Sequence, residues 1–176
     1  MNARMTQHVD GPAPVPRLGT AIASVELREL TARDSSVYLD LVQRNRGWLT
    51  RYGDYQDLVN CTLPDIESDF AKRPNGALRM GIWRGKDLMG RVDVAEVAPG
   101  AFVLGYWLGE EYTGHGYMTE ACRVIMDYAS RTRLVKEYWA GVRHVNLESI
   151  AVVERLGFSV YERLPERNRY RLVCPP

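Results

Sequence analysis

Two glycines, Gly114 and Gly116, stand between a stretch typical of a β-strand and a stretch typical of an α-helix. The strand-like run is AFVLGYWLG, residues 101–109, and the helix-like run is EACRVIMDYAS, residues 120–130. A glycine turn at this place lets several backbone N–H groups converge on one point, and the helix dipole adds partial positive charge there. Such a turn can bind a phosphate or pyrophosphate without a basic side chain. Ordinary turns also contain Gly-His-Gly, so the motif by itself leaves both interpretations open.

A second pair of polar residues, Asn146 and Ser149, lies near the start of the last predicted helix, residues 145–158. Asn146 suits the N-cap position, because its side chain can accept a hydrogen bond from a backbone N–H of the first turn. Gly157 suits the position just after the helix, with Phe158 making the apolar contact beyond it. The two polar residues can therefore serve the helix end alone, or bind a ligand in addition.

Aromatic and charged residues are concentrated in residues 44–56, RNRGWLTRYGDYQ, where the helical pattern of the preceding residues stops. A loop of this composition can shape a substrate pocket, and Trp48 and Tyr52 are its candidate substrate contacts. The alternative is that both rings only pack beneath a connection between two helices. Four acids in and after this region would suit a cationic ligand or would simply be solvated: Asp54, Asp57, Asp65 and Asp69.

Asp93 is an acidic residue inside a predicted strand, between Val92 and Val94. Alternation places its side chain on the opposite face from the two valines. A half-buried carboxylate at such a place can have a raised pKa, which suits a general base, or it can pair with Arg79 or Arg91. Two other acids are weaker candidates for the base, Glu96 and Glu166.

Length and composition predict one globular domain. The chain has 176 residues, of which 45% are hydrophobic and 26% charged, and its formal net charge is +1. This charge gives no reason to expect a nucleic acid or an anionic membrane as a partner. We also expect no membrane span, because no run approaches the roughly 20 apolar residues that a span needs. Three scattered cysteines indicate a cytoplasmic protein without disulfides, and with the histidines they lack metal-ligand spacing: Cys61, Cys122, Cys174, His8, His115 and His144.

The pattern along the chain predicts a flexible tail at residues 1–23, which contain GPAPVP, followed by a folded domain at residues 24–176. Alternating apolar residues predict strands at residues 24–30, 77–83, 88–97, 101–109, 135–142, 159–164 and 169–174. Helical spacing predicts helices at residues 31–42, 63–72, 120–130 and 145–158. Short turns make the strands between residues 77 and 109 an antiparallel meander, and the helical crossover makes the next strand parallel to the last of them.

In this order of elements, three motifs resemble those of the GNAT acetyltransferase superfamily, and within it the ribosomal-protein-alanine N-acetyltransferase (Rim-type) branch. They are GYWLG at residues 105–109, TGHGYMTEA at residues 113–121 and VNLESIAVVERLGF at residues 145–158. The resemblance covers roughly residues 24–174. It implies an α/β (α+β) fold with a mixed central sheet of about seven strands, splayed between the fourth and fifth, and about four helices.

The resemblance also implies acetyl-CoA as the cosubstrate. The family's pyrophosphate loop, Q/R-x-x-G-x-G/A, reads here as residues 113–118, with Thr113 in place of Gln or Arg and Met118 in place of a small residue. Neither change removes a backbone N–H. The implied pyrophosphate contacts are Gly114, His115, Gly116, Tyr117, Met118 and Thr119. The implied contacts of the pantetheine arm are Tyr106, Trp107, Leu108 and Asn146, with Ser149 facing the thioester sulfur.

The implied activity is transfer of an acetyl group to a primary amine by direct attack. The expected acceptor is the α-amine of a protein or peptide N-terminus; the alternatives are a small amine such as an antibiotic or polyamine, or a CoA-binding module without catalysis. Many relatives carry a tyrosine proton donor on the last helix, but residues 150–156 contain none, so Ser149 is the remaining donor candidate. Asp93 is the candidate base. The glycine turn at residues 113–118 lacks the Lys and Ser/Thr of a P-loop, which argues against a nucleotide-binding protein. The sequence is compatible with both a monomer and a homodimer.

Overall fold

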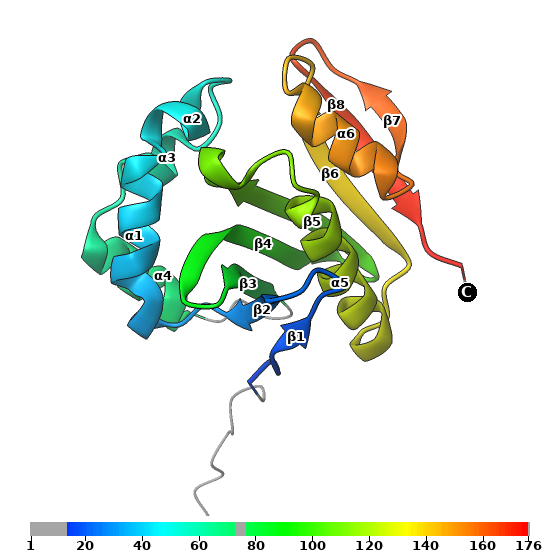
Figure 1. Ribbon diagram of the computed structural model, residues 1–176. Coiled ribbons are helices and arrows are strands. Elements are labelled where there is room, and N and C mark those ends of the chain that lie inside the picture. Colours follow the sequence, from blue (N-terminus) through cyan, green and yellow to red (C-terminus); the bar gives the residue numbers. More distant parts are fainter. Residues whose placement is uncertain (1–13, 73–76, 176) are drawn as a thin grey trace, which may run out of the picture.

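The computed structural model describes residues 14–72 and 77–175, which form one eight-stranded sheet with helices on both faces (Figure 1). The strands are β1 (Leu18–Gly19), β2 (Val25–Glu29), β3 (Leu78–Arg84), β4 (Asp87–Ala98), β5 (Ala101–Leu108), β6 (Glu137–Arg143), β7 (Ser159–Arg163) and β8 (Arg167–Val173). The helices are α1 (Ser35–Arg44), α2 (Arg46–Thr50), α3 (Gln56–Val59), α4 (Leu63–Ala71), α5 (Tyr117–Thr132) and α6 (Leu147–Arg155), with 3-10 turns η1 (Ala32–Asp34) and η2 (Glu110–Tyr112).

The sheet is mixed, in the order β1-β2-β3-β4-β5-β6-β8-β7. Every neighbouring pair is antiparallel except β5 and β6, which are parallel because α5 crosses over between them. Only three residue pairs join β5 to β6, from Ala101↔Glu137 to Val103↔Trp139. Beyond Val103 the two strands diverge (Figure 1). They are the fourth and fifth of the strands predicted from the sequence, so the implied splay between those two strands is confirmed.

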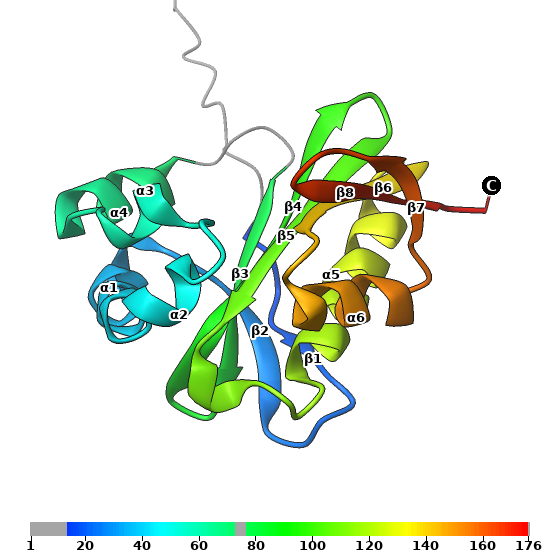
Figure 2. The same cartoon turned by 90° about the horizontal axis from the view of Figure 1, so that it is seen from above.

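The sheet separates two apolar cores. Helices α1–α4 cover one face and α5 and α6 cover the other (Figure 2). Alternate residues of the central strands enter different cores: Val92, Val94 and Leu104 pack with α5, whereas Trp107 packs beneath Tyr38 of α1. Tertiary packing therefore fixes both faces of β4 and β5, and these strands can hold side chains firmly on either side.

Side-chain caps begin two of the helical segments where the sequence predicts helix starts. Asp34 Oδ2 accepts from both the backbone N–H and the hydroxyl of Thr31, at 2.9 Å each. Asp65 Oδ2 accepts in the same way from Thr62 before α4, at 2.8 and 2.6 Å. Each cap satisfies a donor that a helix start would otherwise leave unpaired.

The fold is the predicted mixed α/β architecture, with two differences in number. The sheet has eight strands rather than seven, because residues 18–19, assigned by sequence to the tail of residues 1–23, pair with β2. Residues 1–13 of that tail lie outside the described part of the chain. The described residues contain six α-helices rather than four, because the predicted loop at residues 44–56 folds into α2 and leads into α3. None of the helices described is long and apolar enough to cross a membrane.

The pairing of β4 with β5 depends on a glycine at residue 90. A Cβ atom added to Gly90 would lie 2.2 Å from the backbone oxygen of Trp107 and 2.8 Å from the Cα of Leu108. Both atoms belong to the neighbouring strand, so no side-chain rotation could relieve the overlap. Gly90 therefore permits the register that carries Trp107 and Leu108 to the splayed edge.

Gly90→Ala is expected to lower the free energy of unfolding by about 3 kcal/mol, because the strand pair must separate to admit one methyl group. Urea denaturation followed by circular dichroism measures the change. Gly19→Ala is the matched control, since a Cβ there would meet no heavy atom within 4 Å. Equal stability of the two variants would contradict this account of the strand contact.

Candidate active site

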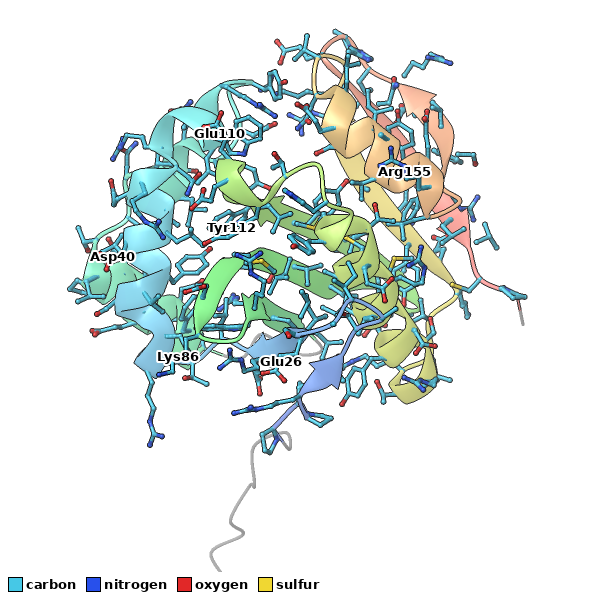
Figure 3. All side chains as sticks on the ribbon, viewed as in Figure 1. Glu26, Asp40, Lys86, Glu110, Tyr112 and Arg155 are labelled. Atoms are coloured by element: carbon cyan, nitrogen blue, oxygen red, sulfur yellow. The ribbon has the colours of Figure 1, made fainter. Side chains whose placement is uncertain are left out.

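A cavity of about 900 Å³ occupies the opening between β5 and β6 and reaches both faces of the sheet. On one face its walls come from the segment of α2 and α3, with Trp48, Tyr52 and Tyr55. On the other face they come from the turn before α5 and from α6, including Gly116 and Ser149. Figure 3 labels Tyr112 and Arg155, two lining residues that come from η2 and from α6. The divergence of two strands thus makes a passage through the sheet.

The turn before α5 presents backbone N–H groups to this cavity. Gly114 and Gly116 have φ of 80° and 78°, and Gly116 is the N-cap of α5. A Cβ at either glycine would meet no heavy atom within 4 Å, so the space in front of the turn is open. α5 has 16 residues, and its dipole adds partial positive charge at this end. The turn and the helix start together have the backbone geometry and the charge that suit an anion.

The residues after Gly116 divide between the cavity and the core. Met118 and Thr119 line the cavity and are 7% and 9% exposed, so Met118 finds its room in the core packed by α5. Tyr117 also lines the cavity. The His115 ring stacks on the Tyr117 ring at 5.4 Å and is not among the cavity-lining residues. An anion at this turn would therefore meet the backbone of the motif rather than its histidine ring.

Two aromatic side chains from the helical segment bind the splayed edge of β5. Trp48 Nε1 donates to the Leu108 carbonyl at 3.2 Å, and the Tyr55 hydroxyl donates to the Tyr106 carbonyl at 2.6 Å. In a strand the N–H and C=O groups of one residue point to the same side. The N–H groups of Tyr106 and Leu108 therefore face the opening, whereas the N–H of Gly109 bonds to Met89 on the other side.

The start of α6 lies across the opening from β5. Asn146 Oδ1 accepts from the Ser149 N–H at 3.1 Å, which confirms the predicted N-cap. The Tyr106 hydroxyl donates to the Ser149 carbonyl at 3.1 Å and so spans the cavity from strand to helix. Burial raises the pKa of Tyr106, which keeps this hydroxyl protonated as a donor. Asn146 and Ser149 line the cavity, and no described residue is bonded to the Ser149 hydroxyl.

Asp93 lies behind the cavity wall rather than in it. Its Oδ2 accepts from Arg91 Nε at 2.6 Å, and Arg91 also donates to the Tyr38 hydroxyl at 2.9 Å. Burial raises the pKa of the Asp93 carboxyl, although the neighbouring Arg91 opposes the shift. Asp93 does not line the cavity, but it is paired with Gly105, which does. The Asp93 side chain is 24% exposed, but its Oδ1 atom is buried and has no hydrogen-bond partner among the described residues.

The two weaker candidates for the base have structural partners. Glu96 Oε1 accepts from the Gly100 N–H at 2.9 Å in the turn between β4 and β5. Glu166 pairs with Arg143 at 3.0 Å. Neither glutamate lines the cavity, and neither do three of the four aspartates, Asp57, Asp65 and Asp69. Only Asp54 of that group contributes to the wall.

Charged side chains join the two walls across the cavity. Arg51 pairs with Glu148 of α6 at 3.2 Å and stacks over the Trp48 ring at 3.2 Å from its centroid. The Tyr52 hydroxyl donates to the same Glu148 at 3.3 Å. In addition, Asp54 accepts from Arg143 Nε of β6 at 3.1 Å. The helical segment is therefore tied to the second half of the molecule by polar contacts.

The structure brings together most of the residues that the sequence singles out. The lining residues among them are Trp48, Tyr52, Tyr106, Trp107, Leu108, Gly114, Gly116, Tyr117, Met118, Thr119, Asn146 and Ser149. Asp93 and His115 are the two that lie outside the lining set. Sequence reasoning missed Arg143 and Glu148, which reach the cavity from β6 and α6. Tyr55 belongs to the aromatic stretch at residues 44–56 that the sequence singles out, but it is not among the candidate substrate contacts. Within the described residues, no group of His, Cys, Asp and Glu could hold a metal ion.

The chain matches a known protein family over most of its length. The model of the acetyltransferase (GNAT) domain family matches residues 24–159. A probable N-acetyltransferase of Bacillus subtilis, YjcK, is 28% identical over 145 residues, which are 77% of this chain and 80% of the relative. The [ribosomal protein uS5]-alanine N-acetyltransferase of Escherichia coli is 25% identical over 155 residues, which are 82% of this chain and 79% of the relative.

A solved structure shares the fold at low sequence identity. The structure of RimL, a ribosomal L7/L12 alpha-N-protein acetyltransferase, in complex with coenzyme A superposes on this chain with a TM-score of 0.77. It is 19% identical, and the match covers 90% of this chain and 98% of that one. The likeness of fold extends over nearly all of both chains.

Gly116→Ala is expected to weaken the binding of coenzyme A by at least about ten-fold, because the strained turn no longer aims its N–H groups at one point. Gly85→Ala is the matched control: φ is 64° there, and a Cβ would also meet nothing within 4 Å, but Gly85 lies in the turn between β3 and β4. Both variants should lose about 1–2 kcal/mol of stability. Calorimetric titration and thermal denaturation measure the two effects, and equal loss of affinity in both variants would contradict the assignment.

Proposed function

This chain belongs to the GNAT acetyltransferase family, and from that premise we propose that it acetylates the N-terminal α-amine of a protein or peptide. As a member of the family it is an acetyl-CoA-dependent N-acetyltransferase. The observation that carries the proposal is the cavity that runs from the glycine turn of α5 through the opening between β5 and β6. The acceptor class rests on the similarity to the alanine N-acetyltransferase of E. coli.

The geometry supports a donor site on the α5 and α6 side of the sheet. The proposed pyrophosphate contacts are the backbone N–H groups at the start of α5: the turn has the positive φ values and the open space that an anion requires. Asn146 can both cap α6 and contact the pantetheine arm, because the cap occupies only its Oδ1. A cavity of about 900 Å³ has the size of a cofactor site.

The open edge of β5 supplies hydrogen-bond donors beside the proposed position of the thioester. Trp48 and Tyr55 donate hydrogen bonds to the carbonyls of Leu108 and Tyr106, respectively. The N–H groups of Leu108 and Tyr106 face the opening. Fixed N–H groups of this kind stabilise the negative charge that develops on the thioester oxygen during attack. We assign this role to the edge of β5 at Tyr106 and Leu108.

In the proposed reaction an ammonium group first loses one proton, because only a neutral amine has the lone pair needed for attack. The nitrogen then bonds to the thioester carbonyl carbon and the carbon–sulfur bond breaks. The second nitrogen proton is lost, and the departing thiolate is protonated. Holding amine and thioester at attack distance can contribute roughly 7–11 kcal/mol to lowering the barrier. The net products are an acetamide, free CoA thiol and one proton.

Two side chains are proposed for the proton transfers. Ser149 is the candidate donor to the sulfur, since its hydroxyl is not bonded to any described residue and it lines the cavity. Asp93 is the candidate acceptor of the first ammonium proton. Because it lies beside Gly105 and outside the cavity wall, its role requires a water molecule between carboxylate and amine.

The acceptor class is tested by thiol release from acetyl-CoA with matched amines. A peptide with a free N-terminus is expected to be acetylated, whereas the same peptide with a blocked N-terminus and a free lysine is not. Turnover with antibiotics or polyamines alone would favour the small-amine alternative. CoA binding without turnover of any amine would favour a non-catalytic module.

The proposed proton donor is tested by Ser149→Ala. This variant should lose roughly ten-fold in kcat and keep its affinity for CoA. Ser159→Ala, at the start of β7, is the control.

Asp93 is tested by the pH dependence of kcat/KM. A base must be ionised, so activity falls as pH drops through the pKa of Asp93, and the raised pKa puts this fall at a higher pH than for an ordinary aspartate. Asp93→Asn should lower kcat/KM and abolish this acid limb. Asp127→Asn removes another arginine-paired aspartate, on the surface of α5, and should leave the profile unchanged. An unchanged acid limb in Asp93→Asn would exclude Asp93 as the base.

A further inference from the structure

β5 and β6 each carry a glycine just beyond their last residue pair. That pair is Val103↔Trp139, and two residues further along the strands are Gly105 and Gly141. Residues two apart in a strand share a face, and Trp107, the next of the series, packs in the core beneath α1. Both glycines also line the cavity. On the face that α1–α4 cover, the opening between the strands is therefore flanked by two residues without side chains.

Neither glycine is required by the backbone or by close packing. Both lie outside the set of residues with positive φ. A Cβ at Gly105 would meet no heavy atom within 4 Å, and a Cβ at Gly141 would meet only the side-chain Cδ of Arg167, at 3.9 Å. Glycine within a strand costs roughly 0.5–1 kcal/mol relative to alanine. The advantage of glycine at these positions is thus the space that it leaves, as at sites where a ligand approaches a backbone closely.

This space lies on the opposite side of the sheet from the proposed donor site. The glycine turn and Ser149 belong to the segments of α5 and α6, which cover the other face (Figure 2). On the glycine side the cavity wall includes Tyr55, whose backbone has an unusual left-handed conformation with φ of 58°. Such strain, on the order of 1–3 kcal/mol, persists only where surrounding contacts enforce it. Here the hydroxyl bond to the Tyr106 carbonyl fixes Tyr55 at the rim of the opening.

We propose that Gly105 and Gly141 form a slot through which the acceptor reaches the thioester, and that the slot selects an amine at the end of a chain about as wide as a peptide backbone. The inference rests on the proposed function, because it places the donor on the side of α5 and α6. Neighbouring strands lie about 4.7–4.9 Å apart, so an extended chain end fits between two strands only where they have moved to about twice that spacing. In this proposal the divergence of β5 and β6 beyond Val103 provides the room. A methyl group at Gly105 would take up part of this open space, and it is expected to hinder an acceptor more strongly as the side chain of its first residue becomes larger.

The test compares Gly105→Ala and Gly141→Ala with Gly19→Ala, in which the new methyl group also enters open space but lies in β1 outside the cavity wall. Peptides that begin with glycine, alanine or leucine serve as acceptors. Gly105→Ala is expected to lower kcat/KM roughly ten- to a hundred-fold for the alanine peptide and further for the leucine peptide. The affinity for CoA and the thermal midpoint should stay as in the parent protein, and Gly19→Ala should match the parent throughout.

Two results would contradict the proposal that Gly105 and Gly141 form an acceptor slot. One is a Gly105→Ala protein with the parent's kcat/KM for all three peptides. The other is a loss of CoA affinity as large as the loss of kcat/KM, which would assign the glycine to the donor side. Failure of the proposed function is a separate result: the parent protein would then acetylate no peptide N-terminus. In that case the same variants are compared on whichever small amine is acetylated, and unchanged kcat/KM there overturns the slot as well.

Discussion

The constraint on which the structure depends is that backbone polar groups need partners where a sheet comes apart. β5 and β6 pair over only three residues and then diverge. The carbonyls that β6 no longer reaches are taken by Trp48 Nε1 and the Tyr55 hydroxyl. The Tyr106 hydroxyl spans the gap to the backbone of α6. These three aromatic donors bond to backbone carbonyls at the opening, where β6 is no longer paired with β5.

The two faces of the sheet contribute different parts of the proposed site at this opening. The face covered by α5 and α6 has the anion-binding turn and the capped start of α6. The other face has the segment of α2 and α3, which carries aromatic rings and is tied to the second half by Arg51–Glu148 and Arg143–Asp54. Exposed ion pairs contribute little stability, usually under about 1 kcal/mol. This segment is therefore held mainly by its apolar core with α1 and by its bonds to β5.

Three departures from local stability rules lie beside this opening, and others lie elsewhere, such as the left-handed backbone of Ser24. Tyr55 has a left-handed backbone, Gly105 lies within a central strand, and the Asp93 Oδ1 atom is buried without a hydrogen-bond partner. Each of these costs free energy where an ordinary residue would not. Natural sequences tolerate such costs chiefly at functional sites.

Local sequence signals determined the strands, the long helix, the glycine turn and the cap at Asn146, because each depends on residues close together in the chain. They could not assign the segment at residues 44–56 to α2 and α3, or join β1 to the sheet, since short elements depend on packing against distant partners. Alternation placed Asp93 on the correct face of its strand, but only the tertiary structure shows that Arg91 holds it behind the cavity wall. Tyr55, Arg143 and Glu148 carry no motif. They meet at the site only because two strands part and the chain folds around the gap.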